Sequence, residues 1–292
     1  VFAASLIRLM MAAPDGRITP VLLSAMKDPS PVVRASACEA ISLRPNPEAA
    51  QALLDATGDG FRLVRIRAAA GLAGYPLDRL ADEVRTRVEK ADREYLAFIM
   101  ARPDQWTSQY NMGNYRLAGG KLKEAVSSYQ AALRIEPRAV LAMVNSSIAY
   151  SRMGDNGNAA KSLLAALKAA PDNPEANFNM VLLEAEKNDA KEAERYLKAA
   201  LKYDPQMAQA AYNLCILLSK DRLEGAVHYC RKASELRPDD PTYAYTLAFF
   251  LYRKGETAEA VRTLKAITKK HPGYKDAELL LGDITKNKGD RP

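Results

Sequence analysis

The stretch that decides the fold is Tyr110–Pro137, which reads YNMGNYRLAGGKLKEAVSSYQAALRIEP. It contains two helical segments, with Gly120 at the turn between them and a proline that closes the second segment. The pattern returns with a period of 33 or 34 residues, and its closing prolines are Pro137, Pro171, Pro205, Pro238 and Pro272. Five copies in phase predict an all-α protein, an α-solenoid of helix-turn-helix repeats.

Side-chain size follows the same period. An alanine lies twelve residues before each closing proline. The small residue near the middle of the first helix is, in order, Gly113, Ser147, Val181, Cys215 and Ala248. The larger residue opposite it is Tyr129, Leu163, Leu197, Cys230 and Leu264. Two antiparallel helices approach closely only where side chains are small, so these columns predict the contact line of each hairpin.

This pattern resembles the tetratricopeptide repeat, a helix-turn-helix unit of 34 residues that stacks into a right-handed superhelix. The clearest copies are Tyr110–Pro137 and Tyr243–Pro272, which reads YAYTLAFFLYRKGETAEAVRTLKAITKKHP. The resemblance implies five units over residues 106–274, followed by a capping helix and tail over 275–292. The fourth unit lacks one residue in its inter-helix turn, near Lys220.

Residues 1–76 carry a different, shorter repeat. DPSPVVRASACEAI (Asp28–Ile41) aligns with DGFRLVRIRAAAGL (Asp59–Leu72) at an offset of 31 residues. It resembles the HEAT or PBS-lyase type, in which a turn Asp caps the second helix and an Arg reaches along the stack to the next turn. We expect two full units, with Val1–Ala13 as an amphipathic helix left from a third unit of a longer chain.

Residues 77–105 join the two repeat types. Leu77–Ala101 has the periodicity of one long helix, which Pro103 ends, and charges alternate along its outer face. We expect a rigid connector helix, because a mobile hinge would be rich in Gly and Ser.

Composition excludes much familiar chemistry. The chain has 292 residues, a net charge of +7, and only three Cys and two His. It contains no Cys-x-x-Cys, no His-Glu-x-x-His and no Ser/His/Asp or Cys/His constellation, so we expect no enzyme, no metal and no cofactor. The richest apolar stretch, Tyr243–Tyr252, is too short to cross a membrane, so we expect a soluble protein of the cytoplasm or periplasm.

Cys215 and Cys230 fall on facing helices of the fourth unit. This placement brings them close enough for a disulfide, which is the less favoured alternative. We expect both to be free thiols, as we expect of Cys38, because unpaired Cys commonly packs as a small buried hydrophobe.

First helices line the concave face in this kind of solenoid, and the stripe opposite the packing stripe points into the groove. The candidate groove residues are aromatic or amide side chains: Tyr110, Asn111, Asn114, Asn145, Phe178, Asn179, Tyr212, Asn213 and Tyr245. Amides can bind a peptide backbone, and aromatic rings can anchor apolar side chains. Packing between neighbouring repeats explains the same columns equally well.

One family mode clamps the carboxylate end of chaperone tails with Lys, Asn and further basic residues. Only Asn114 and Asn145 match that set, since Tyr110 replaces the Lys and Glu175 and Asn179 replace the basic pair. An apolar or amphipathic segment therefore fits this groove better than an acidic tail.

The favoured function is a non-catalytic scaffold that holds a protein or peptide partner in the concave groove. A first alternative, resting on domain order alone, is the C-terminal accessory arm of a larger bacterial protein similar to multihaem c-type cytochromes. A second is nucleic-acid binding through the basic C-terminal surface, which ranks last because no aromatic platform accompanies the charges. These charges are Lys265, Lys269, Lys270, His271, Lys275, Lys286, Lys288 and Arg291. Self-association through uncapped repeat faces is a further option for such arrays.

Overall fold

The computed structural model describes residues 2–11, 17–186 and 189–289, and within these it contains helices and connecting turns without a strand. The side chains of residues 185–186 and 287–289 are not described. Val1, Ala12 and Ala13 of the first expected helix, the tail 290–292 and the Lys288 side chain therefore lie outside the description. The chain divides into two compact units, Val1–Ala169 and Ala170–Pro292, which we treat separately.

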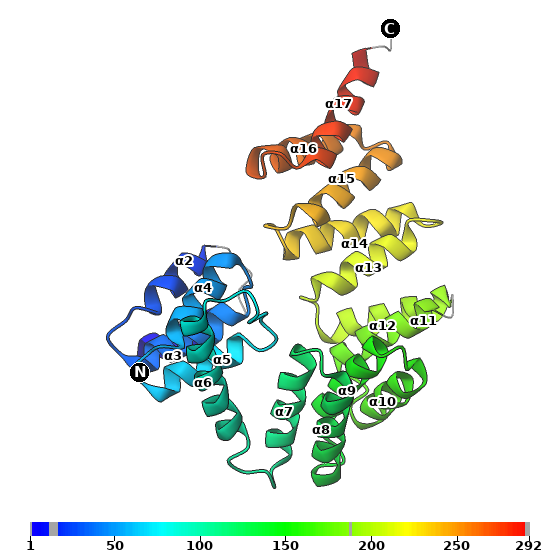
Figure 1. The fold of residues 1–292 in the computed structure, drawn as a ribbon. Coiled ribbons are helices and arrows are strands. Elements are labelled where there is room, and N and C mark those ends of the chain that lie inside the picture. Colours follow the sequence, from blue (N-terminus) through cyan, green and yellow to red (C-terminus); the bar gives the residue numbers. More distant parts are fainter. Residues whose placement is uncertain (1, 12–16, 187–188, 290–292) are drawn as a thin grey trace. The chain divides into compact units, whose positions relative to one another are not determined.

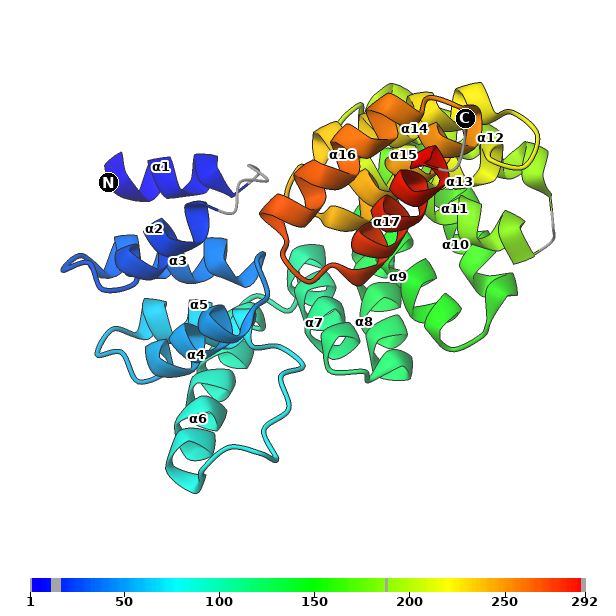
Figure 2. The ribbon, with the colours of Figure 1, turned by 90° about the horizontal axis from the view of Figure 1, so that it is seen from above.

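The first unit begins with short helices stacked in layers (Figures 1 and 2). They are α1 (Phe2–Met10), α2 (Ile18–Ala25), α3 (Pro31–Ser42), α4 (Pro47–Ala56), α5 (Arg62–Gly71) and α6 (Asp82–Ile99). Helices α2 and α3 form one hairpin and α4 and α5 the next, while α1 packs on α3 and α6 packs on α5. Leu22, Ile41 and Val64 are fully or almost fully buried in their shared core.

A ladder of charge-assisted hydrogen bonds runs along these layers, as the repeat predicts. Asp28 and Asp59 each accept a backbone N–H two residues ahead, at 2.8 Å. Arg34 donates from Nε and Nη2 to the Asp59 carboxylate at 2.7 and 3.0 Å. Arg65 repeats this contact with Glu94 on α6 at 2.9 and 2.8 Å. The predicted arginine reach is confirmed at Arg34, which contacts the next turn. The predicted helix cap is not formed, because Asp28 and Asp59 accept from Ser30 and Phe61, the residues that precede α3 and α5, and neither helix has a side-chain cap.

The predicted helix over Leu77–Ala101 is shorter in the structure, because α6 begins at Asp82. The Leu77 carbonyl accepts a hydrogen bond from the Leu80 N–H at 3.2 Å, which forms a turn. Leu77 and Leu80 are apolar because they pack against the core of the first layers, and their spacing imitates a helical stripe. Asp82 and Glu83 then favour a helix start, since carboxylates stabilise the positive end of the helix dipole.

The first unit ends with two longer hairpins, α7 (Trp106–Ala118) with α8 (Leu122–Ile135), and α9 (Val140–Arg152) with α10 (Asn156–Ala169). Gly120 and Gly154 follow α7 and α9 with φ of 71° and 75°, where glycine is predicted. The connector helix α6 contacts α7, and this contact includes a hydrogen bond from Tyr115 Oη on α7 to the Asp92 carboxylate on α6 at 2.6 Å.

The second unit contains three further hairpins and a last helix (Figure 1). The hairpins are α11 (Pro174–Glu186) with α12 (Ala190–Tyr203), α13 (Ala208–Leu218) with α14 (Leu223–Leu236), and α15 (Pro241–Lys254) with α16 (Thr257–Lys270). The final helix, α17 (Lys275–Gly289), packs on α16, and its residues Ala277 and Ile284 are buried in the core that the helices share. The all-α solenoid of repeated hairpins is confirmed.

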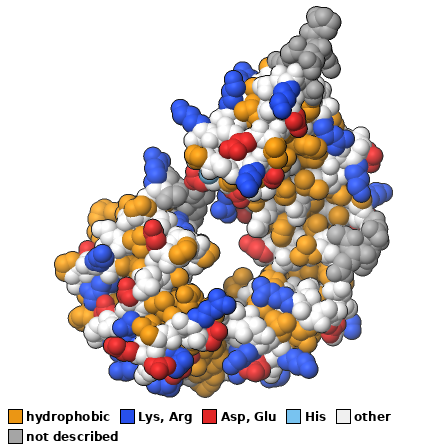
Figure 3. Space-filling model, turned by 45° about the horizontal axis from the view of Figure 1, so that its top comes forward, with side chains coloured by type: hydrophobic (Ala, Val, Ile, Leu, Met, Phe, Trp, Pro, Cys, Tyr) orange, Lys and Arg blue, Asp and Glu red, His pale blue; other side chains and the backbone are white. Residues whose placement is uncertain are grey.

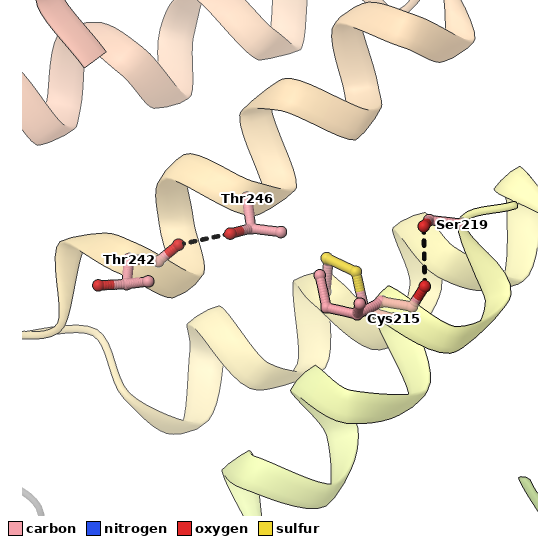
Figure 4. Close-up of a disulfide and its surroundings, with 6 residues drawn as sticks. Cys215, Ser219, Thr242 and Thr246 are labelled. Carbon is pink, nitrogen blue, oxygen red and sulfur yellow. Dashed lines mark hydrogen bonds between the residues drawn. A yellow bond between two sulfur atoms is a disulfide. The ribbon is translucent and has the colours of Figure 1, made fainter. Parts of the chain in front are cut away.

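The prediction of free thiols at Cys215 and Cys230 is wrong. The two residues form a disulfide between α13 and α14, with a Cα–Cα separation of 5.1 Å (Figure 4). Cys215 and Cys230 occupy the positions that Gly113 and Tyr129, the small and the large residue of the pair, occupy in the first tetratricopeptide-like repeat. Two side chains of equal size thus meet head to head on the contact line, which brings the sulfur atoms together. Cys38 is free and buried, as predicted.

Candidate interaction groove

A groove lies in the second unit between α11, α12 and α13, with a volume of about 570 Å³. Its walls are mainly apolar, with Leu182 from α11, Leu197 from α12 and Ile216 from α13. Tyr212, Asn213 and Lys220 add a phenol, an amide and an ammonium group. The groove is therefore an apolar trough with few polar groups at its edge, a composition typical of peptide and ligand sites.

The repeat register explains why these side chains share a face. Tyr212, Asn213 and Ile216 follow one another at spacings of one and three residues, which places them on one side of α13. Residues at the place of Ile216 are exposed in all three first helices of this unit. Their exposed fractions are 54% for Leu182, 42% for Ile216 and 37% for Phe249. One large apolar side chain per repeat is thus left in contact with solvent.

The candidate residues chosen from the sequence omit these three apolar side chains. The sequence does place these three residues at one repeated position of the first helices, which is occupied in turn by Asn114, Ile148, Leu182, Ile216 and Phe249. Such columns commonly pack between repeats, and only the structure distinguishes the exposed members from the covered ones. Figure 3 shows hydrophobic side chains lying in patches between charged ones on the face that it draws.

Three of the candidate groove residues, all in the first unit, form hydrogen bonds with one another. Asn145 Nδ2 donates to Tyr110 Oη at 3.1 Å and to Asn114 Oδ1 at 2.8 Å. Tyr129 Oη donates to the same Asn114 oxygen at 2.9 Å, and burial raises the pKa of this phenol. The cluster joins α7, α8 and α9, so these side chains connect the first two repeats.

The remaining amides are differently placed. Asn111, Asn179 and Asn213 are partly buried, and none of the described residues gives their side chains a hydrogen bond. Asn213 lines the groove directly. An amide without an internal partner retains two donors and an acceptor for a bound backbone.

The aromatic candidates of the second unit pack partly against neighbouring repeats. The Tyr212 ring lies 5.0 Å from that of Tyr243, and the Tyr245 ring lies 5.9 Å from that of Tyr274. Burial raises the pKa of Tyr245. Phe178 is partly buried on α11. Of these residues, Tyr212 is a wall of the groove.

An ion-pair cluster borders the groove on its polar side. Glu194 on α12 accepts from Arg222, in the turn after α13, at 3.0 Å and pairs with Lys198 at 2.7 Å. The Arg222 guanidinium, followed by the Lys198 ammonium, lowers the pKa of this carboxyl to about 2. The cluster therefore ties the third repeat to the fourth through an ionised carboxylate.

The described residues form neither a metal site nor a membrane-spanning helix. Among the described residues, no three His, Cys, Asp or Glu side chains lie together as a metal site. No helix in the described ranges combines the length and apolar character needed to cross a bilayer. Of the basic C-terminal residues, Lys265, Lys269 and Lys275 are exposed, while Lys270 pairs with Asp239 at 2.6 Å.

Family profiles match most of the chain. The HEAT-repeat profile matches residues 3–99, and tetratricopeptide-repeat profiles match residues 107–138, 144–194, 178–241 and 217–284. No curated protein matches the sequence.

Several solved structures are similar to this chain at low sequence identity, and the first named here shares its fold. The Pseudomonas aeruginosa pilF structure is 15% identical with a TM-score of 0.56, and the match covers 79% of this chain and 99% of that one. A MamA fragment from Desulfovibrio magneticus RS-1 is 22% identical with a TM-score of 0.49, over 58% and 96% of the two chains. YrrB, described as a TPR protein with an unusual peptide-binding site, is 18% identical with a TM-score of 0.49, over 63% and 95%.

Proposed function

Because the chain belongs to the tetratricopeptide-repeat proteins and carries HEAT repeats in its N-terminal part, we propose that it is a non-catalytic scaffold. Its binding site is the groove between α11, α12 and α13, and its ligand is a segment of a partner protein. The residues that line this groove all lie in the second unit. The HEAT layers and the hairpins α7–α8 and α9–α10 belong to the first unit.

The observation that carries the proposal is the exposed apolar row Leu182, Ile216 and Phe249. Burying a large apolar side chain from full exposure contributes about 1.5–3 kcal/mol, and covering these side chains, which are 37–54% exposed, contributes about half as much. Recurrence at the same place of three successive repeats presents them to a single extended ligand.

The groove chemistry favours an amphipathic segment. Apolar side chains of the ligand pack on Leu182 and Ile216, while Asn213 binds its backbone or a polar side chain. Lys220 is exposed at the edge of the groove, where it can pair with a carboxylate of the ligand.

The test begins with peptides selected from a random display library on the immobilised full chain, whose affinity is then measured by fluorescence anisotropy. Leu182→Asp combined with Ile216→Asp should weaken binding at least tenfold, because two charges then lie in the apolar trough. Leu164→Asp is the matched control, since Leu164 is also 54% exposed but lies on α10 and is not one of the residues that line the groove. Unchanged affinity in the double variant would contradict the groove assignment.

A further inference from the structure

The disulfide belongs to the helix that forms one wall of the groove. Cys215 lies on α13, which also supplies Tyr212, Asn213, Ile216 and Leu217 to the groove. Its partner Cys230 lies on α14, the second helix of the same repeat (Figure 4). Both cysteines are fully buried, in an apolar cluster that spans α13 to α16.

Cys215 lies on α13 opposite two of the groove residues, while the groove residue Tyr212, three positions away, shares its side of the helix. Each residue turns an α-helix by about 100°, so residues two positions away point to the far side of the helix. Those residues are Asn213 and Leu217, and both line the groove. The sulfur bridge thus fixes the position of the wall without entering the ligand space.

The fourth repeat also has the shortest of the five first helices. Helix α13 has 11 residues, whereas α7, α9 and α11 have 13 and α15 has 14. Gly120, Gly154 and Gly255 follow other first helices with positive φ, but the turn after α13 reads Ser-Lys-Asp-Arg over 219–222. A short helix without this termination depends more on its attachment to α14.

We propose that the Cys215–Cys230 disulfide is a redox lock on the groove. In the oxidised form α13 is fixed against α14 and the groove is ready to bind; reduction frees α13 and weakens binding. A dithiol such as dithiothreitol supplies two electrons and two protons, so the S–S bond becomes two thiols and the reagent becomes a cyclic disulfide. The coupling to binding rests on the proposed function of the groove.

The lock also associates the binding form with an oxidising environment. Protein disulfides persist in secreted, periplasmic or surface proteins, whereas cytosolic glutathione and thioredoxin keep thiols reduced. The burial of both sulfur atoms means that a reductant reaches them only when α13 and α14 separate locally. Reduction and helix opening are therefore parts of one event.

The first test counts thiols after air oxidation of the folded 292-residue chain. Denaturation in guanidinium chloride with iodoacetamide should add one carbamidomethyl group, on Cys38, and prior treatment with dithiothreitol should raise the number to three. In the native state Cys38 should stay unmodified, because burial raises the pKa of its thiol to about 12. Three adducts without reductant would overturn the proposal.

The second test compares hydrogen exchange in the oxidised and the dithiothreitol-reduced protein. Amides of α13 should exchange about a hundredfold faster after reduction, the effect expected from opening a crosslink that closes a 15-residue loop. The α8 amides are the internal control and should not change. The Cys215→Ala/Cys230→Ala variant should be insensitive to dithiothreitol. Equal α13 exchange in both redox states would overturn the lock.

Binding of the selected peptides separates the lock from the groove function. Oxidised protein should bind them at least tenfold more tightly than reduced protein. Equal binding by both forms overturns the coupling. An absence of binding by either form contradicts the groove, and the hydrogen-exchange comparison then decides by itself whether the disulfide fixes α13.

Discussion

At the scale of single residues, Gly113 and Tyr129 form a close contact between two helices. A Cβ on Gly113 would lie 2.4 Å from the Tyr129 ring, which is fully buried and cannot move aside. The small–large column of the repeat therefore has a steric meaning at this position, since glycine is required by the ring opposite it rather than by backbone conformation.

Gly113→Ala should lower the free energy of unfolding of the first unit by about 2 kcal/mol, because overpacking outweighs the gain in helix propensity. Trp106, the single tryptophan, lies in α7 and reports on this unit by fluorescence during urea unfolding. Gly119→Ala is the control in the same segment, since its Cβ would find only ordinary contacts at 3.6 Å or more. Equal stability of the two variants would refute the steric explanation.

At the scale of elements, the arginine ladder connects the N-terminal layers to α6. The Arg34 guanidinium holds the pKa of Asp59 below its ordinary value, and Arg65 does the same for Glu94. Carboxylates with a lowered pKa stabilise the fold above their ordinary pKa of about 4, and this contribution is lost as the pH falls through the folded-state pKa.

Arg34→Gln should therefore cost about 2 kcal/mol of unfolding free energy at pH 7, and the difference from the native chain should shrink below about pH 4. The measurement is urea unfolding followed by Trp106 fluorescence at pH 7 and pH 3. Arg67→Gln serves as the control, because the ion pair of Arg67 with Glu39 is weak. The two groups are 3.9 Å apart and both side chains are about one third exposed, so solvent screens the pair. A loss at pH 3 as large as that at pH 7 would show that Asp59 is not the partner that matters.

The elements also show where sequence reasoning ends. Periods of 34 and 31 residues predicted the hairpins and the glycine turns, because both depend on spacing along the chain. The arginine reach was implied by the resemblance of residues 1–76 to HEAT repeats. The start of α6 was misplaced because Leu77 and Leu80 serve the core from a turn at helical spacing. The disulfide was ranked below free thiols because that ranking followed the behaviour of an average Cys, although the repeat register already placed Cys215 opposite Cys230.

At the scale of the whole molecule, the candidate residues divide between the two units. Tyr110, Asn114 and Asn145 satisfy one another within the first unit, while Tyr212 and Asn213 line the groove of the second. The sequence could not separate them, because one repeat position can face a neighbouring hairpin in one unit and solvent in another. The exposure of Leu182 and Ile216 depends on the side chains packed around them and not on their position in the repeat. Because these two residues are exposed, the proposed binding site lies in the second unit.

The measurement that tests the central proposal most directly is hydrogen exchange of the full, oxidised chain with and without a saturating selected peptide. We expect added protection in α11 and α13, whose side chains form the walls of the groove, and unchanged exchange in α3 and α5 of the HEAT layers. Protection confined to helices outside the groove, with α11 and α13 unchanged, would contradict the proposal.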